Sequence, residues 1–300
     1  MKDLAPRYRP LGRFAAPVAA QRQPLWQPFL GALTVVALYL AFLFALGIFL
    51  QQRYGTLLAA GIAQAMLSAG SPGAALLLLY SFTGMALAVL ATVRLIHGRS
   101  AITLFGQGRT AVAHFLTATR AVLVVALVAL VVALATERPA PGLGLSTFLL
   151  YLPAALLGIL LQVTAEELVF RGYLLQELAA RFRSPLIWAG LSSFLFGLGH
   201  YQPGAYGANA WPIVLWAVLF GLAAADLTAR TGTIGAAVGL HFANNLAAFL
   251  FIGVAGDMDG LALWTRTIDL AAPGDVLPIL LVDFLTILLA WLAVRISLRV

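Results

Sequence analysis

The stretch Thr147–Phe170, TFLLYLPAALLGILLQVTAEELVF, decides the fold of this chain. It is long and apolar enough to cross the ~30 Å hydrocarbon layer of a membrane, which takes about 20 residues in a helix. Near its end it carries two adjacent carboxylates, Glu166 and Glu167. Such groups are costly in lipid unless they are paired or hydrated, and they often mark function. The stretch therefore predicts a membrane helix with a polar site near one end.

The rest of the chain has the same apolar character. Of its 300 residues, 62% are hydrophobic and only 10% are charged, whereas soluble domains have about 25% charged residues. Apolar runs bounded by charge, Gly or Pro predict membrane spans. We therefore expect an all-α, polytopic transmembrane helix bundle with eight spans, at Pro28–Leu50, Pro72–Leu95, Ala121–Ala135, Thr147–Phe170, Pro185–His200, Trp211–Thr228, Thr233–Val254 and Val276–Val294.

Two regions follow from this pattern. Residues 1–26 hold Lys2 and four arginines and lack the apolar core and cleavage site of a signal peptide, so we expect a basic cytoplasmic tail. Residues 27–300 are predicted to form one transmembrane domain, with its motif-bearing core at 147–254. No internal repeat is evident, and Gln51–Ser71 is expected to lie along the membrane surface.

The basic residues predict the orientation in the membrane. If loops alternate between the two sides, fifteen of the eighteen Lys and Arg residues fall on the side of the termini, and only Arg53, Arg138 and Arg266 fall on the other. The positive-inside rule then places both termini in the cytoplasm of a multi-pass protein of the cell (inner) membrane. Topology accounts for the basic excess, so no nucleic-acid partner is implied. The absence of cysteine excludes disulfides and thiolate zinc sites.

Three apolar spans carry polar motifs. In the fourth span, Glu167 and Arg171 are four residues apart and therefore lie on one helix face, where they can pair. Glu166 lies about 100° around the helix and can point elsewhere. Asp226 and Arg230 have the same spacing and are expected to form an interfacial ion pair. His97 and His114 lie in cytoplasmic segments and are expected to be solvated.

The depths of these groups in the membrane can be compared. Glu166 and His200 each lie seventeen residues from Arg183, in the turn between the fourth and fifth spans. In an antiparallel hairpin they should meet at one level. His241 and Asn245, four residues apart in the seventh span, are expected at a comparable depth. Four polar groups can thus converge inside the membrane.

A pair of glycines precedes this last motif. Gly235 and Gly239 form a G-x-x-x-G spacing, which lets a neighbouring backbone come close. We therefore expect a tight helix contact near His241.

Two kinds of chemistry fit these groups. A buried glutamate beside a histidine can take a proton from water, while a second histidine and an amide stabilise an oxyanion. Alternatively, Glu166, His200 and His241 are ligand types of a catalytic zinc site of the metalloprotease kind. The residues alone leave both open. We prefer the metal-free mechanism, because Asn245 is a poor zinc ligand and suits an oxyanion donor better.

The three motifs together resemble the CPBP intramembrane proteases, which include the CAAX prenyl endopeptidases and bacterial proteins linked to bacteriocin self-immunity. That family is marked by E-E-x-x-x-R, F-x-x-x-H and H-x-x-x-N or H-x-x-x-D. The corresponding residues here are Glu166, Glu167 and Arg171, then Phe196 and His200, and then His241 and Asn245. The resemblance covers about residues 147–254.

The resemblance implies an intramembrane endopeptidase acting on a membrane-embedded or lipid-anchored peptide or protein. Glu166 would activate water with His200, and His241 and Asn245 would stabilise the oxyanion or help bind a metal. Glu167 and Arg171 would support the site. The family has been described both with and without a metal, so zinc stays an open cofactor. High Ala and Arg with little Lys suggests a bacterial source.

Other functions remain as alternatives. A proton-coupled transporter could use Glu166, His200 and Asp283 of the eighth span as a relay, although no repeat supports it. A non-catalytic membrane scaffold or immunity protein is a further possibility, but no motif is degraded. The H-E-x-x-H and G-x-S-x-G motifs of other hydrolases are absent.

The orientation generates a first prediction. A phosphatase that is active only outside the cytoplasm, fused after Val300, should be inactive in cells, because the charge bias retains both termini inside. The same phosphatase inserted beside Asp269, in the acidic loop on the other side, should be active. Activity of the Val300 fusion would reverse the orientation.

Overall fold

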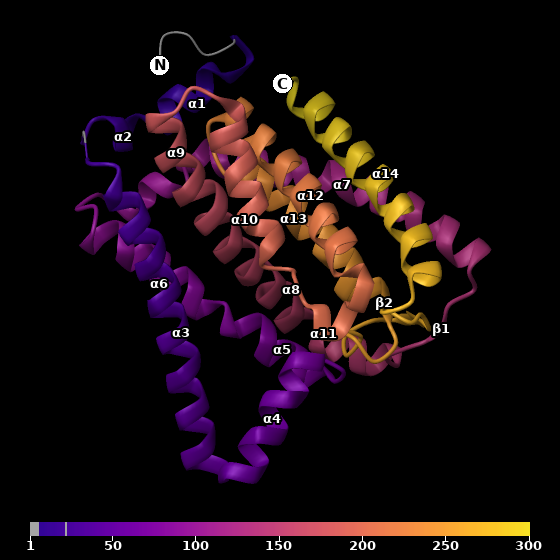
Figure 1. Cartoon of the computed structure of the whole chain (residues 1–300). Coiled ribbons are helices and arrows are strands. Elements are labelled where there is room, and N and C mark those ends of the chain that lie inside the picture. The colour runs from indigo at the N-terminus through magenta and orange to yellow at the C-terminus, as the bar shows by residue number, and fades with distance from the viewer. Residues whose placement is uncertain (1–5, 22) are drawn as a thin grey trace.

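All eight apolar segments form helices in the computed structural model of the chain, which describes residues 6–21 and 23–300. The helices pack into one bundle, and the first described helix and the C-terminal end of the last helix lie at the same end of it (Figure 1). This placement agrees with an even number of crossings. Lys2 and Arg22 of the basic tail lie outside the described residues. The predicted all-α, polytopic class is confirmed.

The helices of the first half are α1 (Arg9–Phe14), α2 (Ala16–Ala19), α3 (Trp26–Tyr54), α4 (Thr56–Ser68), α5 (Pro72–Ser81), α6 (Thr83–Leu95) and α7 (Gly108–Thr136), with 3₁₀ turns η1 (Pro6–Tyr8) and η2 (Ala101–Leu104). The second half comprises α8 (Leu145–Glu167), α9 (Leu175–Arg181), α10 (Ser192–Leu198), α11 (Pro203–Tyr206), α12 (Ala210–Thr231), α13 (Gly235–Leu246) and α14 (Pro273–Leu298), with the 3₁₀ turn η5 (Gly207–Asn209).

Three π-helical segments interrupt the helices that carry the motifs. They are η3 (Leu168–Leu174) between α8 and α9, η4 (Leu186–Leu191) before α10, and η6 (Ala247–Phe251) after α13. Segments with i→i+5 hydrogen bonds are rare and are frequent at functional sites. Each widens the turn and so re-aims the side chains that follow it.

Six of the spans are long enough by themselves to cross a membrane. The other two, Leu186–Leu198 and Gly235–Phe251, are shorter, and they bring His200 and His241 to the site. The third span was predicted too short at Ala121–Ala135, because its polar first half also continues the helix α7 from Gly108.

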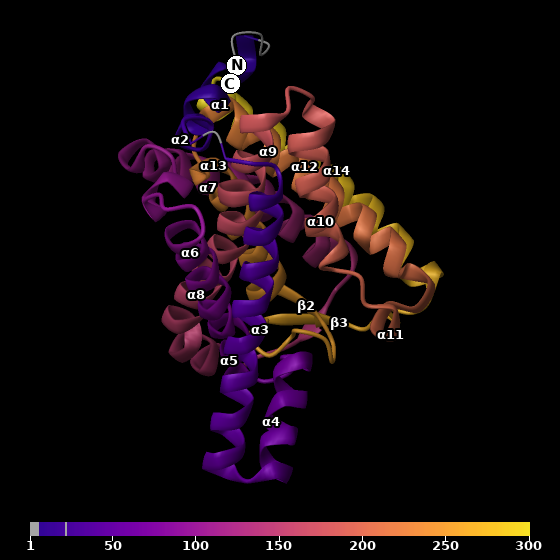
Figure 2. The ribbon, with the colours of Figure 1, turned by 60° about the vertical axis from the view of Figure 1, so that its left-hand side comes forward.

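The segment after the first span does not follow the expectation of a surface helix. After the turn at Gly55, α4 runs back alongside the end of α3, and this hairpin projects beyond the rest of the bundle opposite the termini (Figures 1 and 2). The sequence TLLAAGIAQAMLS is apolar nearly all round, so it has no polar face with which to lie on a surface.

A small sheet closes the same end of the bundle. Its strands β1 (Ala140–Pro141), β3 (Trp264–Arg266) and β2 (Ile252–Val254) lie in that order, with β1 antiparallel and β2 parallel to β3. Arg266 pairs with Glu137 at 3.2 Å beside it. The sheet thus ties the loop before α14 to the end of α7.

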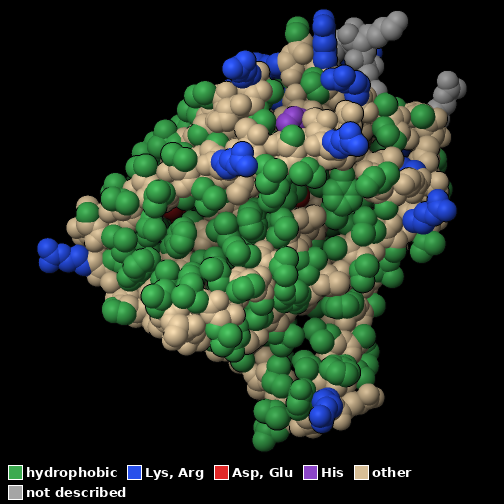
Figure 3. All heavy atoms as spheres, turned by 180° about the vertical axis from the view of Figure 1, so that it is seen from behind, with side chains coloured by type: hydrophobic (Ala, Val, Ile, Leu, Met, Phe, Trp, Pro, Cys, Tyr) green, Lys and Arg blue, Asp and Glu red, His purple; other side chains and the backbone are tan. Residues whose placement is uncertain are grey.

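The surface has the character of a membrane protein. On the face seen in Figure 3, hydrophobic side chains cover a broad area, while most Lys and Arg side chains gather at the end of the termini. This matches the charge bias in the sequence. The protein is a multi-pass membrane protein.

The basic tail is packed against the bundle. Leu11, Phe14 and Val18 are buried, and Tyr8 donates a hydrogen bond of 2.8 Å to Asp226. Asp226 also pairs with Arg230 at 2.7 Å, as expected.

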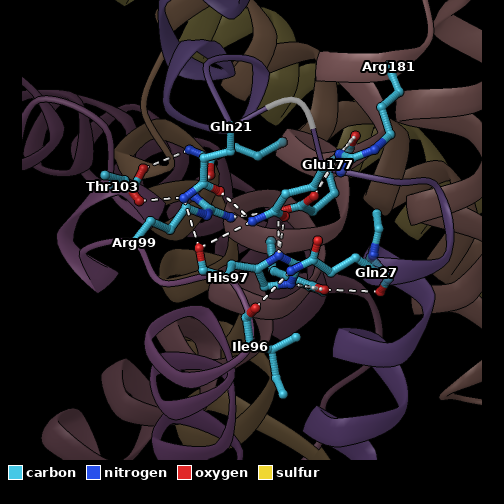
Figure 4. A network of polar contacts seen from close by, with 12 residues as sticks. Gln21, Gln27, Ile96, His97, Arg99, Thr103, Glu177 and Arg181 are labelled. Carbon is cyan, nitrogen blue, oxygen red and sulfur yellow. Dashed lines mark hydrogen bonds and ion pairs between the residues drawn. The ribbon is translucent and has the colours of Figure 1, made fainter.

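A polar network beside the tail corrects the prediction for His97. Its side chain is buried and lies between the Gln23 side chain and the Tyr173 hydroxyl, at 2.7 and 2.9 Å. Glu177 accepts from Arg99 and Arg181 at 2.9 and 2.7 Å (Figure 4). Burial lowers the pKa of His97, and Glu177 opposes this shift only in part. The network joins the tail, the loop after α6 and α9.

The two glycines before His241 create the expected close contact. A Cβ at Gly235 would collide with the backbone carbonyl of Ala111 on α7, and one at Gly239 would lie 2.6 Å from the Phe115 carbonyl. Only glycine allows this approach. The contact fixes α13, and with it His241, against α7.

This contact predicts the effect of one added methyl group. Gly235→Ala should destabilise the protein by about 1–3 kcal/mol, because the backbone of α7 must move away. Thermal unfolding in detergent measures the change. Gly190→Ala is the matched control, since no atom lies within 4 Å of the position where its Cβ would be. Equal melting temperatures of the two variants would contradict the packing.

Candidate active site

The site is built on a fully buried ion cluster. Glu167, the last residue of α8, accepts hydrogen bonds from Arg171 Nη1 and His241 Nδ1, each at 2.9 Å and each to Oε1. Glu167 and Arg171 have no solvent exposure, and His241 has 4%. Removing one partner of a buried ion pair leaves the charge of the other partner without compensation. The cluster therefore locks α8 to α13.

Aromatic rings and a glycine shape the space around Arg171. Its guanidinium lies 4.6 Å from the centre of the Phe196 ring on α10, a cation–π distance. A Cβ at Gly221 of α12 would lie 3.1 Å from Arg171 Nη2. Three spans thus meet at this one side chain.

Glu166 points to a different side of the cluster, as its position on the helix predicted. Its Oε2 accepts a hydrogen bond of 2.6 Å from Gln162 Nε2 and lies 3.5 Å from His241 Nε2. The Glu166 side chain keeps 13% exposure. One carboxylate is therefore held in the interior while its neighbour remains accessible.

The amides of α13 extend this chain of contacts. Asn245 donates to Gln162 Oε1 at 2.9 Å, and Asn244 donates to Asn245 at 3.2 Å. Asn245 is thus linked to Glu166 through Gln162. The predicted spacing of His241 and Asn245 holds, since both face α8.

His200 lies beside the cluster. Among the described residues, no hydrogen bond or ion pair joins Glu166 directly to His200. Nδ1 of His200 lies 3.0 Å from the Phe196 carbonyl, and the Phe196 ring packs against both histidines, with its centroid 4.8 Å from that of His200 and 5.9 Å from that of His241. The π-helices η3 and η4 interrupt the uniform α-helical rise on which the common level of Glu166 and His200 rests, and that level stays a prediction.

The arrangement does not fit the zinc alternative. Within residues 6–21 and 23–300, no three His, Asp or Glu side chains converge as metal ligands would. The contact of His241 Nδ1 with Glu167 leaves Nε2 as the ring's possible ligand atom, and Glu166 Oε2 is hydrogen-bonded by the Gln162 amide, a weak ligand. The proposed ligand set Glu166, His200 and His241 gains no support from this geometry.

Known proteins share this part of the chain. Residues 146–247 match the family model for type II CAAX prenyl endopeptidase Rce1-like proteins, which confirms the resemblance that the three motifs indicated. The protein named Uncharacterized protein YyaK of Bacillus subtilis (strain 168) is 34% identical over 126 residues. The match covers 40% of this chain and 42% of that relative. No solved structure matches.

One residue of the site, Gln162, does not belong to any of the three motifs. It connects Glu166 to Asn245 through hydrogen bonds. Its signal was its position one helical turn before Glu166, as a polar residue in an otherwise apolar span.

The buried cluster predicts an asymmetric effect of mutation. Arg171→Leu should destabilise the protein by about 3–5 kcal/mol, because Glu167 keeps its charge without the guanidinium. The double variant with Glu167→Gln should recover part of this loss. Thermal unfolding in detergent measures both.

Arg266→Leu serves as the control for this experiment, since its pair with Glu137 is partly exposed and should contribute at most about 1 kcal/mol. If Arg171→Leu is no more harmful than Arg266→Leu, the cluster does not hold the bundle together.

Proposed function

We propose that this protein is an intramembrane endopeptidase that hydrolyses a peptide bond in a membrane-associated or lipid-anchored substrate. The family match over residues 146–247 supports a protease of this kind. The polar cluster inside an apolar bundle supports hydrolysis at membrane depth. No nucleic-acid or soluble partner is required.

The observation that carries the proposal is the position of His241 between two carboxylates. Its Nδ1 lies 2.9 Å from Glu167 and its Nε2 lies 3.5 Å from Glu166. Both ring nitrogens therefore face carboxylate oxygens.

Each group has a task in hydrolysis. Glu166 in its carboxylate form can accept a proton from water. His200 donates its Nδ1–H to the Phe196 carbonyl, so its Nε2 is free to accept from the same water. The second N–H of Asn245 is a donor for the oxyanion, and His241 is a further donor when its Nε2 carries a proton.

The proposed reaction proceeds in two steps. The water oxygen bonds to the carbonyl carbon of the substrate while Glu166 takes the proton, and the carbonyl oxygen becomes an oxyanion. The C–N bond then breaks as Glu166 returns the proton to the leaving nitrogen. Glu167 and Arg171 touch no reacting atom and hold His241 in place. Gln162 orients Glu166 through its hydrogen bond.

The transporter alternative has less support. A relay through Asp283 would need a polar path to Glu166, and no hydrogen bond of Asp283 with another described residue provides one. The ordered contacts of Gln162, Glu166 and His241 would also be unnecessary in a passive scaffold. We place the protein in the inner membrane of a bacterium, with its termini in the cytoplasm.

The proposal predicts that Glu166→Gln abolishes proteolysis and preserves the fold. An amide keeps the size and one acceptor of the side chain but cannot take the proton, so the rate should fall at least ~10²-fold. The substrate is found first, as a membrane polypeptide that accumulates uncut in cells expressing the variant. Cleavage of it is then measured with purified protein.

Asp275→Asn is the control, because it removes a carboxylate that is exposed in the first turn of α14. It should cleave at the wild-type rate. A folded Glu166→Gln protein with wild-type activity would rule out the role of Glu166.

A further inference from the structure

A cavity of about 600 Å³ is lined by residues of α7, α12, α13 and α14. One end of it is lined by Asn244 and Asn245, so it is continuous with the candidate site. Its other end reaches Glu137 and Arg266 beside the small sheet. Most of the wall between these ends is apolar. The volume is in the range of sites that bind a ligand.

The carboxyl group of Asp283, on α14, lies on the apolar part of this wall. In the part of the chain that the structure describes, its carboxylate makes no hydrogen bond or ion pair. Arg266, the cation that acts on it, is already paired with Glu137 at 3.2 Å. A carboxylate at membrane depth without a direct partner is expensive and points to a function. Its partner would come from a ligand.

A second polar group of the cavity also lacks a partner. Nε1 of Trp216, on α12, is buried and makes no hydrogen bond to any residue that the structure describes. Trp216 stacks on Phe220, whose ring lies 4.9 Å from His241. Buried indole N–H groups usually find an acceptor. The cavity thus offers an unused donor near the site and an unused anion on α14.

We propose that this cavity binds the substrate on one side of the scissile bond and selects a positively charged side chain. The cation, from Lys or Arg, would lie against Asp283, and the Trp216 indole would donate to a backbone carbonyl of the same peptide. A long aliphatic stem with a charged end suits the apolar wall around the Asp283 carboxylate. This selectivity rests on the proposed function, since it assumes that the ligand is a peptide.

A binding experiment tests the proposal without catalysis. The protein carries Glu166→Gln so that no peptide is cut, and is purified in detergent. The probes are fluorescent Ala/Leu-rich peptides of sixteen residues with one Lys, moved one position at a time, and matched peptides with uncharged norleucine at each position. Anisotropy should show at least one register in which Lys binds about tenfold more tightly than norleucine.

Three further variants, each in the Glu166→Gln protein, assign the effect to its residues. Asp283→Asn should remove the preference for Lys and leave norleucine binding unchanged. Asp275→Asn, on the same helix but outside the cavity, should keep the preference. Trp216→Phe should weaken both peptides equally. Melting temperatures confirm that each variant is folded.

The proposal is overturned if no peptide binds, if Lys and norleucine bind equally in every register, or if the preference survives Asp283→Asn. These outcomes are separate from the fate of the proposed function. A protein that shows the preference but never cleaves a peptide would keep the cation site and lose the protease assignment.

Discussion

A carboxylate buried among membrane helices must be paired, and the pairing of Glu167 organises this protein. The side chain has no exposure and accepts from Arg171 and His241. To satisfy it, α13 must bring its histidine to α8, and the glycine contact with α7 makes that position possible. Arg171 in turn requires space beside Phe196 and Gly221. The neighbouring Glu166 is then left accessible at a defined place.

Most of the fold follows from the sequence because it depends on local properties. Apolar length predicts the spans, and four-residue spacing predicts the pair of Glu167 and Arg171, since both are set within one helix. The match of residues 146–247 to a known family agrees with the motifs. The orientation of the termini rests on charge bias alone.

What could not be predicted depends on contacts between distant segments. The burial of His97 arises from contacts with the tail and with Tyr173 of η3, which lie far apart in the sequence. The π-helical segments themselves could not be predicted, because the sequence pattern of a regular helix does not show them. Gln162 was overlooked because its importance becomes visible only when Asn245 arrives from α13.

The shortness of two helices has a consequence for water. Leu186–Leu198 and Gly235–Phe251 each have fewer than 18 residues, so they extend about 26 Å at most, less than the ~30 Å hydrocarbon layer. Beyond their ends, the chain continues as loops and short strands, whose polar backbone is tolerated at membrane depth only within protein or beside water. Because these two helices are shorter than the hydrocarbon layer, less apolar helix separates the histidines from water on one side of the membrane. A reaction that consumes water could be supplied from there without an open pore.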